Sequence, residues 1–314
     1  MEKYINPYTD FGFKKLFGSE LNKELLIGFL NALFEEAKQL PDDRILDVKY
    51  LNNEQLGRSP YDRKAVFDVL CETEKGAKFH LEMQNVFQEF FIDRTIYYAT
   101  FPIQSMAKKD SAEEGRWNFQ LQRLYSVNLL NFTFRKDKKK DADGSDKETI
   151  VNEISEDDLM HCVMLKNIKT DKIFYDKLIF IYLEMPKFKK PIEECKTFYE
   201  KWLFVLQNLT RLMERPKELQ ERVFKRLFEQ AEIANYTPEE HEAYEVSLKN
   251  LWDIANGMEA AEKKGIEKGR AEGAHAQAIQ SARNAKALNL PIETIVQLTG
   301  LTPGEIAAIQ PENK

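Results

Sequence analysis

Two strand-like segments joined by a very short turn constrain the fold of this 314-residue chain more than any other feature. Residues 64–72 form an apolar run rich in β-branched and aromatic side chains, and residues 78–86 alternate between apolar and polar. Both patterns are typical of β-strands. Between them lies Glu74-Lys75-Gly76. A three-residue loop with glycine in the left-handed position commonly closes a hairpin, so we expect the two strands to pair antiparallel.

The length of this loop predicts which residues face each other. With three loop residues, Asp68 is opposite Glu82, and the two carboxylates stand on one face of the hairpin. Directly opposed Cβ atoms are about 5 Å apart. A two-residue loop would instead place the two carboxylates on opposite faces.

Asp68 needs an explanation, because it interrupts the apolar run from Val66 to Leu70. A carboxylate in such surroundings is costly without a partner or a metal ion. Two carboxylates so close together either share a proton or hold a cation. Since no His or Cys stands with them, the oxygen ligands favour Mg²⁺ or Mn²⁺. Gln84 shares the face of Glu82 and can orient a water. The alternative is a polar strand face that meets solvent, and both interpretations stay open.

The remaining patterns divide the chain into an α/β part and a helical part. Helices are predicted at 20–38 and 89–108, the second containing Pro102. Further strands are predicted at 45–52, 121–134, 158–165 and 177–184, with a charged solvated loop at 136–148. From Pro191 the pattern is helical, with segments at 192–212, 216–235 and 238–256.

We therefore predict four regions. They are a core at 1–190, a helical extension at 191–256, a Gly-rich charged helical linker at 257–275 and a small helix-turn-helix-like tail at 276–314. Glycines four apart in the linker permit close approach of another helix, although a flexible charged linker is the favoured interpretation. The C-terminal helices are a candidate surface for a homo-oligomer.

Composition limits the functional classes. The net charge of −6 excludes nucleic-acid binding driven by overall charge, so any such contact needs a local patch. Three cysteines without a Cys-x-x-Cys spacing exclude a disulfide scaffold and a zinc ribbon, and fit a reducing compartment. Without a long apolar run or a signal segment, the sequence predicts a cytoplasmic protein that does not cross a membrane.

Several stretches together resemble a known family. They are DFGFKKLF (10–17), LIGFLNALF (26–34), Phe67-Asp68-Val69, LEMQ (81–84), RTIYY (94–98), residues 240–253 and the Gly-rich tail. Their order resembles the PD-(D/E)XK nuclease superfamily and, more narrowly, the Rpn family of recombination-promoting nucleases, also described as PD-(D/E)XK family transposases. The resemblance implies an α/β fold, with a restriction-endonuclease-like mixed sheet core flanked by helices and an all-helical C-terminal region.

The resemblance also implies roles for individual residues. Asp68 and Glu82 would ligate Mg²⁺, with Mn²⁺ as a substitute. Gln84 takes the place of the superfamily's Lys, although Glu-x-Gln is usual in the narrower family. Because Gln carries no charge, another cation is needed near the scissile phosphate. The candidates for that cation are Lys14, Lys64 and Arg94.

Four residues have two interpretations each. Asp10 or Thr9 is expected to cap the helical turn at 11–17, and for Asp10 this role is favoured over that of a ligand. Glu24 is either a third acidic ligand or, as favoured, part of a solvated helix face. Arg94 and Tyr98 share a helix face and either contact DNA phosphate or buttress the site.

The function that this combination favours is that of a Mg²⁺-dependent DNA endonuclease that hydrolyses phosphodiester bonds and promotes recombination or serves a mobile element. Two alternatives come from other classes. One is a DNA-binding or assembly protein on an inactive nuclease core, which the Gln84 departure supports. The other is a structural interaction protein whose helical tail oligomerises.

Overall fold

The computed structural model describes residues 2–37, 44–55, 65–106, 119–134, 139–140, 146–147 and 158–310. The chain forms two compact units, Met1–Lys249 and Asn250–Lys314. The helix α6 (Pro238–Ala287) contributes residues to both units. Lys64 and most of the predicted charged loop at 136–148 lie outside the described residues.

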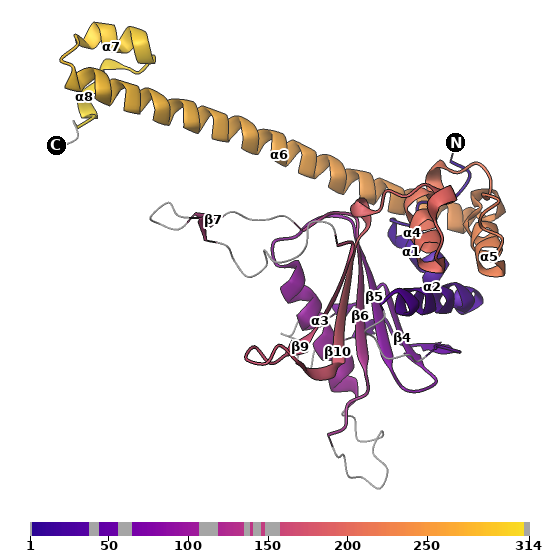
Figure 1. The fold of residues 1–314 in the computed structure, drawn as a ribbon. Coiled ribbons are helices and arrows are strands. Elements are labelled where there is room, and N and C mark those ends of the chain that lie inside the picture. Colours follow the sequence, from indigo (N-terminus) through magenta and orange to yellow (C-terminus); the bar gives the residue numbers. More distant parts are fainter. Residues whose placement is uncertain are drawn as a thin grey trace. The chain divides into compact units, whose positions relative to one another are not determined.

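A six-stranded mixed sheet is the centre of the first unit, in the order β1-β4-β5-β6-β10-β9 (Figure 1). Its strands are β1 (Val48–Tyr50), β4 (Val69–Thr73), β5 (Lys78–Gln84), β6 (Leu124–Leu130), β9 (Met160–Lys166) and β10 (Ile173–Glu184). The β5–β6 and β6–β10 pairs are parallel and the other pairs are antiparallel. The predicted mixed sheet flanked by helices is therefore confirmed.

Helices cover both faces of this sheet (Figure 1). One face carries α1 (Asp10–Phe17), α2 (Lys23–Glu36), α4 (Phe198–Asn208) and α5 (Arg222–Ala231). The opposite face carries α3 (Phe91–Ser105), which packs on even-numbered residues of β6 and β10. Because side chains alternate along a strand, each strand supplies one set of residues to each helical layer.

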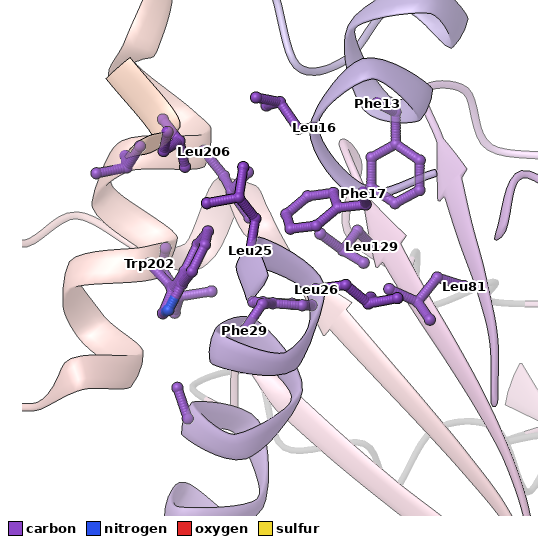
Figure 2. Packing of buried hydrophobic residues seen from close by; sticks show 14 of the residues in the cluster. Phe13, Leu16, Phe17, Leu25, Leu26, Phe29, Leu81, Leu129, Trp202 and Leu206 are labelled. Atoms are coloured by element: carbon purple, nitrogen blue, oxygen red, sulfur yellow. The ribbon is translucent and has the colours of Figure 1, made fainter. Parts of the chain in front are cut away.

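Aromatic side chains fill the core on the α1–α2–α4 face (Figure 2). The rings of Phe17 and Phe29 lie 5.9 and 5.7 Å from that of Trp202, and all three side chains are fully buried. Burying each such side chain contributes roughly 1.5–3 kcal/mol. This packing joins α4 to the N-terminal helices, although α4 lies more than 160 residues further along the chain than α2. Residues up to Lys249 thus belong to one unit.

The hairpin of β4 and β5 has the predicted register. Leu70 pairs with His80 and Cys71 with Phe79. Gly76 has a φ of +82°, the left-handed conformation for which glycine was expected. The Thr73 N–H donates to the Ala77 carbonyl at 2.8 Å and closes the loop.

The prediction of a single strand over residues 64–72 is wrong. The chain bends at Phe67 and Asp68, and Ala65–Val66 forms a separate strand, β3, that pairs with β2 (Glu54–Gln55). Asn53 causes the bend, because its carbonyl accepts the Phe67 N–H at 2.9 Å while its side chain binds the Asp68 carbonyl and the Leu70 N–H, each at 3.0 Å. Asp68 is therefore at the start of a strand and not in its middle.

The second unit is helical. Residues 257–275, for which a flexible linker was favoured, are helical and exposed within α6. The helix α7 (Ile292–Thr299) ends at Gly300, whose φ is 70°, and α8 (Pro303–Ala308) begins after a capping box at Thr302. Ile295, Leu301 and Ile306 pack on the last turns of α6. Among the described residues, no helix combines the length and the apolar character needed to span a membrane.

Candidate active site

Asp68 is held against β5 by a hydrogen bond from the backbone. Its Oδ2 accepts the Met83 N–H at 2.8 Å. The ladder ends at the pair of Val69 with Leu81, so Asp68 is one residue and Met83 two residues beyond it. In an uninterrupted antiparallel ladder, the carbonyl of Phe67 would accept that N–H. Because the chain bends away at Phe67, the Asp68 carboxylate replaces the carbonyl. The same bend thus breaks the strand and places Asp68 beside the Glu82 peptide.

Glu82 is buried with an unsatisfied oxygen. The residue is 8% exposed, and its Oε1 has no hydrogen-bond partner among the described residues. Burial raises the pKa of Glu82 well above its usual range, and the negative charge of Asp68 raises it further. Burial also raises the pKa of Asp68 to about 6, although the Met83 N–H opposes this shift. As they stand, the two carboxylates resist ionising together, and a bound cation would remove that penalty.

Arg94 brings a positive charge from α3 to this pair. Its guanidinium donates to Gln84 Oε1 and, at 2.8 Å, to Gln88 Oε1. It also lies over the rings of Phe91 and Tyr98, 5.2 and 5.8 Å from their centroids. The Arg94 charge lowers the pKa of both Asp68 and Glu82, against the larger effect of burial.

Both polar atoms of the Gln84 amide have a hydrogen-bond partner. Its Oε1 accepts from Arg94 and its Nε2 donates to the Val86 carbonyl at 2.8 Å. The position that carries Lys in the superfamily is thus occupied by a neutral side chain hydrogen-bonded to an arginine. Gln84 thus contacts Arg94, and its expected role of orienting a water stays a prediction.

Asp10 and Lys14 of α1 also act on the carboxylates. They form an ion pair at 2.7 Å, and the charge of Asp10 raises the pKa of Asp68 while that of Lys14 lowers it. Thr9 is the N-cap of α1, because its hydroxyl accepts the Gly12 N–H at 2.9 Å. Of the two expected caps, Asp10 and Thr9, the structure has Thr9, and the Asp10 side chain pairs with Lys14 instead.

The other predicted residues are placed differently. Glu24 pairs with Arg222 and Arg226 of α5, each at 3.7 Å, and no described contact joins it to Asp68 or Glu82. Tyr98 packs edge-on against Phe67, 5.6 Å between ring centroids, and so supports the bend beside Asp68. Lys64 lies outside the described residues.

No group of three His, Cys, Asp or Glu side chains within the described part of the chain is arranged to hold a metal ion. The acidic part of the site is the pair Asp68 and Glu82. Such a pair suits Mg²⁺, which is commonly bound by one or two carboxylates and keeps several of its waters.

Sequence reasoning missed a buried polar residue next to Glu82. Asn128 of β6 is the register partner of Glu82 and is fully buried. The only signal was the alternation of Ser126 and Asn128 with apolar residues in a strand whose seven residues are all buried. An alternating pattern alone does not separate a buried polar row from a solvated face.

A hollow of about 570 Å³ lies elsewhere, beside β9 and β10. Its lining is mostly apolar, with side chains such as Ile92, Ile96, Phe180 and Tyr182, and it includes His161. Neither Asp68 nor Glu82 lines it. The carboxylate pair and this hollow are therefore separate features.

A protein-family model described as "PD-(D/E)XK nuclease family transposase" matches residues 7–261. The match extends from the segment before α1 through the sheet and the helices on both faces into α6. Comparison with curated proteins finds no match, and comparison with solved structures finds none either.

Proposed function

Because the chain belongs to the PD-(D/E)XK nuclease family transposases, we propose that it is a Mg²⁺-dependent DNA endonuclease with Asp68 and Glu82 at its centre. The family suggests a nuclease and DNA as the substrate. The observation that carries the proposal is the unpartnered Oε1 of Glu82, buried beside a second carboxylate. An unsatisfied buried oxygen is costly, so its presence calls for a ligand that supplies positive charge.

The residues present fit a hard divalent cation. Asp68 and Glu82 would hold it through carboxylate oxygens, and the fully buried thiol of Cys71 is on the opposite face of the hairpin, with the α1–α2 core. When bound, the ion polarises a phosphoryl oxygen and lowers the pKa of a coordinated water. The carboxylates then lose the electrostatic penalty that raises the pKa of each in its absence.

Arg94 is our choice for the cation that the superfamily obtains from Lys. Gln84 and Gln88 hold its guanidinium, and two aromatic rings flank it, so its position near the carboxylates is maintained. A guanidinium can bind a phosphate through two parallel hydrogen bonds, which Lys cannot do. Arg94 would thus bind the scissile phosphate and stabilise its developing charge.

We also propose that the protein acts in the cytoplasm, promotes recombination or serves a mobile element, and self-associates through its C-terminal helices. Substrate DNA is bound chiefly through phosphates near Lys14 and Arg94, so its affinity falls steeply as salt rises.

Cleavage of supercoiled plasmid by the full chain tests this proposal. We expect nicking that requires Mg²⁺ or Mn²⁺ and disappears on Asp68→Ala, while DNA binding remains. Glu24→Gln is the matched control, since Glu24 is an acidic residue paired with arginines of α5. Plasmid left intact by the wild type with either metal, or cut equally by Asp68→Ala, contradicts the endonuclease.

A second candidate is a DNA-binding protein on an inactive core. Gln84 favours it, because this side chain carries no charge and its amide already contacts Arg94 and the Val86 carbonyl. This candidate predicts salt-dependent DNA binding by the wild type with no metal-dependent cleavage, and equal DNA binding by Asp68→Ala.

A further inference from the structure

A row of buried polar side chains extends from the carboxylate pair into the sheet, beneath α3. Glu82 of β5 pairs in register with Asn128 of β6, which pairs with Tyr182 of β10. Residues on adjacent parallel strands that share a register position have their side chains on the same face. That face is the α3 side, since Tyr182 contacts Thr95 of α3 at 2.8 Å.

The orientation of the Asn128 amide is set by its nitrogen. Nδ2 donates to the Ser126 hydroxyl at 3.0 Å, the Ser126 carbonyl at 3.2 Å and the Ile181 carbonyl of β10 at 3.3 Å. Exchanging the nitrogen and oxygen would bring Oδ1 against two carbonyl oxygens. The nitrogen is thus held on the β10 side, which leaves Oδ1 for the side of β5 and Glu82.

Asn128 Oδ1 and Glu82 Oε1 are both buried without a hydrogen-bond partner among the described residues. Both are acceptors, and they belong to neighbouring residues on one face. Leaving each unsatisfied would cost about 1–3 kcal/mol. A water molecule donates two hydrogen bonds and can satisfy both oxygens at once. Mg²⁺ and Mn²⁺ sites built on two carboxylates retain such waters in their shell.

We propose that Asn128 is a positioning residue of the cation site, where its Oδ1 accepts a hydrogen bond from a water of the ion's shell beside Glu82. The inference rests on the proposed cation site at Asp68 and Glu82. Asn128 adds a neutral oxygen from the neighbouring strand β6, and this oxygen strengthens the binding of the ion without adding negative charge. Substituting residues that orient metal ligands and waters typically weakens metal binding 10–100-fold.

Titration calorimetry of the full chain with Mn²⁺ alone, without DNA, tests the role of Asn128. We expect Asn128→Leu, which keeps the branching at Cγ and removes the polar atoms, to weaken Mn²⁺ binding by about 10–100-fold. Asn22→Leu is the matched control, because Asn22 is another buried asparagine whose Oδ1 has no partner among the described residues, and no described contact joins it to Asp68 or Glu82.

Wild-type Mn²⁺ affinity in Asn128→Leu, or an equal loss of affinity in the control Asn22→Leu, overturns the inference alone. Thermal melting without metal shows whether each variant is folded, and Asn128→Ala replaces the leucine variant if that one fails to melt cooperatively. Absence of Mn²⁺ binding by the wild type overturns both this inference and the cation site itself. Binding that Asp68→Asn abolishes and Asn128→Leu leaves unchanged separates the two.

Discussion

Two buried glutamates in the same sheet have opposite environments. Glu184, at the end of β10, is fully buried, and its oxygens contact His161 at 2.6 Å, Lys187 at 2.7 Å and the Phe134 N–H at 2.7 Å. Burial opposes the ionisation of Glu184, but these contacts outweigh it and lower its pKa. Glu82, in β5, has an oxygen without a partner and a raised pKa.

The difference separates a carboxylate whose charge is compensated within the fold from one for which we propose a bound cation. Groups of the same chain compensate the negative charge of Glu184, so this carboxylate needs no bound ligand. Glu82 faces a second carboxylate, and its electrostatic penalty persists until a cation arrives. Burial alone therefore does not mark a candidate functional carboxylate, whereas burial together with a raised pKa and an unpartnered oxygen does.

The largest expected effect comes from removing the charge of Glu82. We expect Glu82→Gln to lower Mg²⁺-dependent plasmid cleavage by at least about 10³-fold, roughly 4 kcal/mol in transition-state stabilisation. The melting temperature should stay the same or rise, because the variant removes an uncompensated buried charge. Cleavage rates and melting curves of the same preparation measure both. A large drop in melting temperature would remove the contrast with Glu184.

Glu184→Gln should show the reverse. Removing one partner from a buried charge network leaves the others uncompensated, and we expect a loss of about 3 kcal/mol in the free energy of unfolding. Urea denaturation measures it. Per folded molecule, cleavage should change little, since Glu184 is not among the charges that shift the pKa of Asp68 or Glu82. A stable Glu184→Gln variant without cleavage activity would assign the second glutamate a functional role as well.

The pH dependence of stability also distinguishes the Asp68–Glu82 pair from Glu184, with a smaller expected effect. Because the folded-state pKa of Asp68 is raised from 3.8 to about 6, the folded protein binds a proton in this range that the unfolded chain has lost. The metal-free protein should therefore lose stability as pH rises from about 4 to about 6, by about 1–3 kcal/mol relative to Asp68→Asn.

Urea denaturation in EDTA at a series of pH values, for wild type and variant side by side, measures this difference. Glu184 has the opposite sign, because a lowered pKa gives stability that is lost as pH falls. Taking the difference between wild type and Asp68→Asn cancels its contribution. Parallel curves for the two proteins would show that Asp68 is not strained in the folded state.

The smallest effect concerns Arg94. We expect Arg94→Gln to reduce cleavage by about 10–100-fold, because the cation near the phosphate is lost while the carboxylates remain. Arg94→Lys should recover part of the activity, since it keeps the charge but not the two-pronged geometry. Rate measurements across salt concentrations check both variants. Unchanged rates in Arg94→Gln would mean that another cation, such as Lys14, takes this role.

Local patterns predicted the central hairpin. Loop length and the glycine at position 76 gave its register, and the structure has that register from Val69 to Glu72. The helices near α2 and α3 were also predicted, with ends that differ by a few residues. These features depend on residues close together in the chain, so a short window of sequence contains the physical information that decides them.

The surroundings of the candidate site required the tertiary structure. The bend at Asp68 depends on Asn53, and the charge at position 84 comes from Arg94 on α3. The neutral oxygen beside Glu82 belongs to Asn128, 46 positions further along the chain. Hydrogen bonds between separate segments leave no periodic signal in the sequence.

By itself, the sequence determined the register of the hairpin that carries Glu82, because side-chain alternation and loop length are local properties. The α/β nuclease-like fold was implied by the resemblance of several motifs to a known family. Only the tertiary structure decided that Asp68 turns its carboxylate to a backbone amide, that Glu82 keeps an unsatisfied oxygen, and that Glu184 does not. The compensation of a buried charge depends on which distant groups the fold brings to it.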